Sequence, residues 1–294
     1  MSERLPQRAA RKHESTIGDQ AAGLRSLLKR RVLRLLPVQG DFDTHGQGAC
    51  AAQIAMGLAR CGRNVILLDA VGAALAALGK RTNADLRLLI EGERDFADVA
   101  VRCAPGLRAI AAQEGLPALL AADAANNDFF AGFLRLDDPA DLIVVNLPAT
   151  LPPTGRRWLP LLGDDAETLL VMGTGERSLT AAYAAIKQAS APPRASAFRV
   201  LVNGAGGERE ARAACRQLAD TARRFLGATV GYCGNLQRNT RGQIYSGAAA
   251  PHAEATRTFT RIAAEAQDPT LEQTAQAGGL IADRAFMLAR GTLR

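Results

Sequence analysis

A glycine-containing stretch at residues 39–48 is the part of the chain best suited to bind an anion. Its sequence, Gln-Gly-Asp-Phe-Asp-Thr-His-Gly-Gln-Gly, follows an expected strand at residues 32–38 and precedes an expected Ala-rich helix at 49–61. Backbone N–H groups at the start of a helix bind phosphate, and ligands of open α/β sheets lie at the carboxyl ends of the strands. The position therefore predicts a phosphate site.

This stretch lacks the side chains that a nucleotide-binding loop uses to bind phosphate and magnesium. A nucleotide-binding loop needs a lysine for the β- and γ-phosphates and a Ser or Thr hydroxyl for magnesium. The chain contains no Gly-Lys-Ser or Gly-Lys-Thr. His45 is a lone loop histidine, and its spacing from Asp41 and Asp43 is too unspecific to predict a metal site. Taken alone, the stretch fits a plain strand–helix connection equally well.

Expected strands and helices alternate along the chain, and they would position this loop. Further strands are expected at the apolar runs 64–69, 107–111, 141–145, 168–172, 198–202 and 229–233. Helices are expected near residues 85–91, 115–135, 178–190, 207–226, 251–266 and 271–290. This alternation predicts an α/β fold with a doubly wound, mainly parallel sheet flanked by helices. One domain at 32–294 is expected.

An N-terminal arm, residues 1–31, precedes the domain. It is expected to be a disordered basic tail followed by a short helix at 19–30, with Asp19 at the N-cap position. Apolar residues repeat at helical spacing in this helix at Leu24, Leu27 and Leu28. A stripe of this kind on so short a helix needs a groove in which to be buried.

Charge and cysteine content narrow the functional classes. The net charge of +7 comes from 36 basic and 29 acidic residues and is concentrated in the arm. A solvated tail explains this better than nucleic-acid binding does. Five scattered cysteines fit a reducing compartment, and we found no apolar run long enough to span a membrane. A cytoplasmic protein is expected.

Several motifs together resemble one family. Residues 19–25, DQAAGLR, match a DQAxxLR motif, and residues 55–70 resemble a segment that ends in LLDAD. Residues 176–187 resemble PEPTSLTDAYALIK, and Asn203 fits an asparagine at a strand end that faces adenine. These motifs are typical of the FlhG (FleN) family, MinD/ParA-type regulators of flagellar number. The resemblance covers about residues 19–250 and implies a SIMIBI-type P-loop NTPase fold.

Against the family pattern, the nucleotide site is degenerate. The family's nucleotide-binding positions correspond here to Phe42, Gly46, Gln47, Gly48, Asp69, Asn146 and Asn203. Phe42 and Gln47 replace two lysines, while Gly48 and Asn146 replace two groups linked to magnesium. Asp69 is interpreted as a structural cap of the segment that follows it.

These losses predict a pseudo-ATPase with no catalytic residue, no metal site and no required cofactor. Weak residual nucleotide binding through backbone N–H groups is left open. Two alternatives also stay open. One is an active MinD/ParA-type ATPase with an unorthodox phosphate loop, and the other is a ParA-like positioning factor on DNA or membrane.

The resemblance also implies partners. In the family, the DQAxxLR helix docks on FlhF, an SRP-type GTPase, and stimulates its GTP hydrolysis. The residues expected to do so here are Asp19, Gln20, Leu24, Arg25 and Leu28. A flagellar transcriptional regulator and switch proteins are further candidates. An amphipathic segment at 280–290 fits peripheral contact with the inner face of the membrane and packing against the domain equally well.

Overall fold

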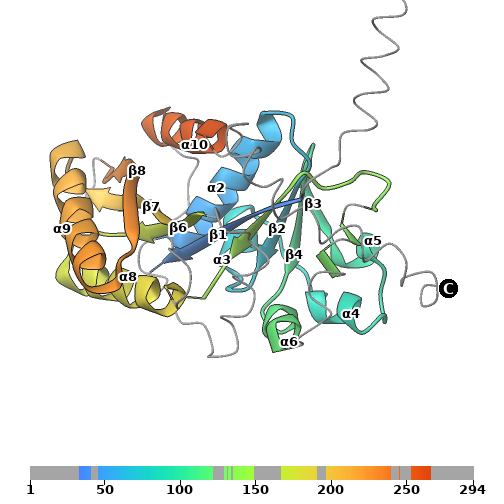
Figure 1. Cartoon of the computed structure of the whole chain (residues 1–294). Helices are drawn as coiled ribbons and strands as arrows, with labels where there is room; N and C mark the ends of the chain where they lie inside the picture. Colours follow the sequence, from blue (N-terminus) through green and yellow to red (C-terminus); the bar gives the residue numbers. More distant parts are fainter. Residues whose placement is uncertain are drawn as a thin grey trace, which may run out of the picture. The chain divides into compact units, whose positions relative to one another are not determined.

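The computed structural model in Figure 1 describes residues 33–40, 46–121, 129–130, 132–133, 135–148, 167–190, 197–239, 245 and 253–265. The expected helices at 19–30 and 271–290 and the segment 280–290 lie outside these residues. The domain boundary predicted near residue 31 stays a prediction.

One eight-stranded sheet organises the described chain. Its order is β3-β4-β2-β5-β1-β6-β7-β8, and every neighbouring pair is parallel except β3 and β4. The strands are β1 Arg34–Gly40, β2 Val65–Asp69, β3 Val101–Ala104, β4 Leu107–Ala111, β5 Leu142–Asn146, β6 Glu167–Met172, β7 Ala197–Ala205 and β8 Thr229–Gln237. The predicted doubly wound, mainly parallel α/β sheet is confirmed.

Helices cover both faces of this sheet (Figure 1). They are α2 Gln47–Arg60, α3 Ala73–Ala77, α4 Leu86–Ile90, α5 Phe96–Val99, α6 Gly115–Ala121, α8 Glu176–Ala189, α9 Glu208–Leu226 and α10 Ala253–Glu265. One apolar cluster joins the sheet to α2, α3 and α10, and two others join its opposite face to α4–α6 and to α8 with α9.

The central strands are apolar because both of their faces are covered. Every residue of β2 and β5 is buried, and alternate side chains enter different clusters. Leu67 and Val144 pack on the α2 side, whereas Ile66 and Ile143 pack on the opposite side. Such strands read as continuous apolar runs, which explains why the sequence predicts them closely.

The loop after β1 is shorter than predicted. The strand was expected at 32–38, but Gln39 and Gly40 pair with Leu170 and Val171 of β6 and extend it to Gly40. Helix α2 also begins two residues early, at Gln47. The reason is that Gly46 adopts a left-handed φ of 65° and its carbonyl accepts from Cys50 N at 2.9 Å, which closes the first turn.

Other differences concern short elements. Of the helix expected at 115–135, the described residues include α6, Gly115–Ala121, and further helical residues at 129, 130 and 132. The elements α3, α5 and β3 were not predicted, because four or five residues are too few to show a helical or strand period.

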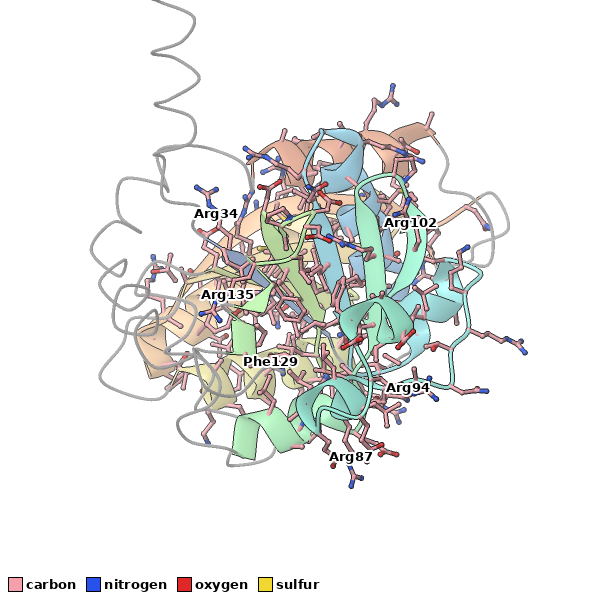
Figure 2. The ribbon with its side chains drawn as sticks, turned by 90° about the vertical axis from the view of Figure 1, so that its right-hand side faces the viewer. Arg34, Arg87, Arg94, Arg102, Phe129 and Arg135 are labelled. Atoms are coloured by element: carbon pink, nitrogen blue, oxygen red, sulfur yellow. The ribbon has the colours of Figure 1, made fainter. Side chains whose placement is uncertain are left out.

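Four phenylalanines pack together next to α4, α5 and α6: Phe96, Phe129, Phe130 and Phe133. Phe96 and Phe129 both pack edge-to-face on Phe133, with ring centroids 5.8 and 5.3 Å apart. Figure 2 shows Phe129 on this side of the molecule, and Arg87 extending outward from α4. Among the described helices, none is long and apolar enough to cross a membrane.

Candidate functional site

Gln47, the first residue of α2, directs its side chain back to the carboxyl edge of the sheet. It is 4% exposed. Its Nε2 donates to Val38 O at 3.1 Å, to Leu147 O at 2.5 Å and to Asn146 Oδ1 at 2.7 Å. Gly40 leaves the necessary room, since a Cβ there would lie 2.7 Å from Gln47 Oε1. The amide at the position of the family's lysine is therefore engaged within the protein.

Asn146 and Asp69 continue this hydrogen-bonded chain. Asn146, the last residue of β5, donates through Nδ2 to Asp69 Oδ1 at 2.8 Å. The Asp69 carboxylate also accepts from Gly72 N at 2.9 Å and from Leu75 N at 2.7 Å. Both side chains are fully buried. These bonds confirm that Asp69 caps the segment after β2.

The hydrogen bonds of this network all run in one direction, from donor to acceptor, toward Asp69. Gln47 donates to Asn146, Asn146 donates to Asp69, and Asp69 accepts from backbone N–H groups. Hydrogen bonds to a charged group contribute about 1.5–3 kcal/mol each, and an unpaired buried charge is costly. The network therefore supplies the buried Asp69 carboxylate with donors from one side-chain amide and from the backbone.

Gly48 brings two helices into direct contact. A Cβ at this position would lie 2.5 Å from Ala73 Cβ, 2.7 Å from Ala73 C and 2.8 Å from Ala74 N. Two of these three atoms belong to backbone and cannot turn aside. The position at which the family has a magnesium-binding hydroxyl is thus filled by the start of α3.

Asn203 lies in β7 and is 1% exposed. Its Nδ2 donates to Tyr245 O at 2.8 Å, and its Oδ1 accepts from Tyr245 N at 3.2 Å. Gly46 borders the same contact, because a Cβ on Gly46 would lie 2.0 Å from Tyr245 O. The strand-end asparagine, the start of α2 and Tyr245 therefore meet.

The ionisable groups beside this contact are not poised to react at neutral pH. Burial raises the pKa of the Cys50 thiol far above its ordinary range, and Cys233 raises it further. Burial also raises the pKa of Tyr245 to about 12, with a smaller contribution from Cys50. A nucleophilic cysteine needs a lowered pKa, so Cys50 is a core residue.

The structure brings six of the seven predicted nucleotide-site residues to the carboxyl edge of the sheet or the start of α2. Phe42, the seventh, lies outside the described residues, as do Asp19, Gln20, Leu24, Arg25 and Leu28 of the arm. Sequence reasoning missed Tyr245 and Ala73. Asn203 and Tyr245 are 42 residues apart, and no local pattern signals such a contact. Within the described ranges, no group of three His, Cys, Asp or Glu residues could hold a metal ion.

Comparison with known proteins gives one curated relative and many similar folds. No family model matches the chain. The antiactivator FleN of Pseudomonas aeruginosa is 29% identical over 209 residues, which cover 69% of this chain and 72% of FleN. This relationship confirms the resemblance predicted from the motifs.

Solved structures agree on the fold. The septum site-determining protein MinD of Pyrococcus horikoshii, complexed with Mg-ADP, has a TM-score of 0.57 and 16% identity, covering 81% of this chain and 98% of MinD. MinD of Aquifex aeolicus has a TM-score of 0.55 and 17% identity, covering 79% and 96%. A plasmid partition protein of Borrelia burgdorferi has a TM-score of 0.54 and 12% identity, covering 82% and 98%.

Gly48→Ala should destabilise the protein, because the new methyl group overlaps Ala73. Overpacking of this kind costs about 1–3 kcal/mol in free energy of unfolding. Gly57→Ala in the same helix is the matched control, since its nearest contact, Ala263 Cβ, would be an ordinary 3.4 Å away. Urea unfolding of the two variants measures the difference. Equal stability of both would show that α3 does not press on α2.

Asn146→Asp should destabilise the protein in a pH-dependent manner, because it places a second carboxylate beside Asp69. The loss of the donor to Asp69 alone costs about 1–3 kcal/mol. The carboxyl groups of Asp and Glu have a pKa of about 4 in the unfolded chain. Repulsion makes the folded pair harder to ionise, so the penalty should grow as pH rises above that value and fade in acid. A penalty of equal size at acid and neutral pH would contradict the network.

Proposed function

We propose that this chain, a relative of FleN with the fold of MinD- and ParA-type ATPases, is a FlhG-like regulator of flagellar number and placement that works without an ATPase cycle. The observation that supports this most directly is the buried chain from Gln47 through Asn146 to Asp69. It engages the polar side chains at the ends of β2 and β5 and the start of α2.

The free-energy balance of nucleotide binding supports the same proposal. Mg·ATP brings several negative charges that lysines and a magnesium ion must balance, and phosphoryl transfer relies on those cations. Here the lysine position is an amide that donates inward, and the hydroxyl position is closed by Ala73. Losing one charged partner costs about 1.5–3 kcal/mol, so losing several lowers affinity by orders of magnitude. The described residues do not fit Mg·ATP.

The arm supplies the active part of the proposed mechanism. Its motif at 19–25 resembles the FlhF-binding motif of the family, and Asp19, Gln20 and Arg25 are its polar members, with Asp19 at the expected N-cap position. A rigid, charged arginine fork and a neutral amide suit contact with phosphates and water in a GTPase site. The apolar stripe of the same helix provides the docking surface. The MinD-like domain then acts as a scaffold that presents the arm.

Equilibrium titration should detect no tight binding of Mg·ATP, and purified protein should show no turnover above background. Gln47→Lys alone should not restore activity, because Gly48 and Asn146 still cannot hold magnesium. Gln47→Ala is the control for loss of the amide. Micromolar affinity together with turnover that Gln47→Ala abolishes would sink the pseudo-ATPase proposal and favour the unorthodox ATPase.

A peptide of residues 1–32 should accelerate GTP hydrolysis by the cognate FlhF. Replacing Gln20 and Arg25 together by Ala should abolish the acceleration, because the amide and the arginine fork of the motif are removed. Replacing Gln7 and Arg4 by Ala is the matched control, since the same residue types are lost outside the motif. An unchanged hydrolysis rate with the native peptide would exclude the FlhF link.

A further inference from the structure

The side chain of Asn203 is held by the backbone N–H and C=O groups of one residue, Tyr245. The Asn203 amide donates to the carbonyl of Tyr245 and accepts from its N–H, at 2.8 and 3.2 Å. Tyr245 therefore satisfies a donor and an acceptor of the same amide with its own backbone. A buried amide left without such partners costs about 1–3 kcal/mol, so the reciprocal pair is a stabilising contact.

Two further features fix Tyr245 at this place. Its ring packs on Phe259 of α10 with centroids 5.6 Å apart, next to the apolar cluster under α2. Its carbonyl lies directly against Gly46, where any side chain would overlap it. The absence of a Cβ at Gly46 is thus used to admit the chain's own backbone.

A bound nucleobase can form the same pair of hydrogen bonds with an asparagine side chain. An asparagine amide binds the edge of adenine through one donor and one acceptor, and the carboxyl edge of a parallel sheet is where such ligands lie. The backbone N–H and C=O of Tyr245 offer the same pair of groups. We infer that the Tyr245 backbone is an internal ligand that occupies the Asn203 amide and excludes nucleobases from it. This inference rests on the proposed function, in which no nucleotide is needed.

Hydrogen exchange at the Tyr245 amide, followed by NMR on the full chain, tests the contact. The N–H should be protected in the native protein. It should exchange at least about tenfold faster in Asn203→Ala, which loses the acceptor, and in Gly46→Ala, which displaces the carbonyl. Gly227→Ala is the control for backbone strain, because Gly227 has the same φ of 65° and nothing within 4 Å of a Cβ. An unprotected Tyr245 amide in the native protein would overturn the inference.

Adenosine binding tests the exclusion. Tyr245→Pro and Tyr245→Ala both remove the ring, but only proline removes the N–H that pairs with Asn203. Adenosine should therefore bind at least about tenfold more tightly to Tyr245→Pro than to Tyr245→Ala or the native protein. Equal affinity in the three proteins would overturn the inference.

Adenosine also separates this inference from the proposed function. It has no phosphates, so its affinity does not depend on the replaced lysine and magnesium positions. ATP turnover by the native protein would refute the pseudo-ATPase proposal and leave the exchange test of Tyr245 to be judged independently.

Discussion

The buried carboxylate of Asp69 is the constraint on which the candidate site depends. A buried charge needs hydrogen-bonding partners, and here side-chain amide and backbone donors supply them. The requirement explains why Asn146 stands at the end of β5, since a second carboxylate would repel the first. It also explains Gln47, whose amide donates to Asn146 and to the carbonyls of Val38 and Leu147. Two replacements, Gln47 and Asn146, thus form one self-consistent network with Asp69.

The glycines of the loop have a related explanation. Each of Gly40, Gly46 and Gly48 permits a contact that a side chain would prevent, with Gln47, Tyr245 and Ala73 in turn. Close approach of backbone is a general reason for glycine. At these three positions the approaching group belongs to the protein itself. At these positions the edge of the sheet is consequently occupied by the protein's own groups.

The sequence allowed the fold to be predicted because its main elements have strong local signals. The run at 64–69 and the alternation of strands and helices indicated the parallel sheet, and strands buried on both faces read as apolar runs. The contacts of the site have no such signal. Gln47 meets acceptors about a hundred residues further along the chain, and Tyr245 meets Asn203 across 42. The motif comparison identified which residues were replaced, whereas only the structure showed what they contact.

In the proposed mechanism, the N-terminal arm carries the function, and the edge of the sheet has a structural role. The domain has the fold of the MinD structures, and its polar edge groups stabilise that fold. The proposed partner contacts then depend on residues 19–30, whose motif is independent of the nucleotide site.

Thermal unfolding with and without Mg·ATP tests this claim most directly. A ligand that binds only the folded protein raises its stability, by about 4 kcal/mol at a thousand times the dissociation constant. For a chain of this size, micromolar binding at about 1 mM Mg·ATP would raise Tm by roughly 10 °C. We expect Mg·ATP to cause no measurable change in the Tm of this protein. A rise of that size would show that the site binds nucleotide and would contradict the central claim.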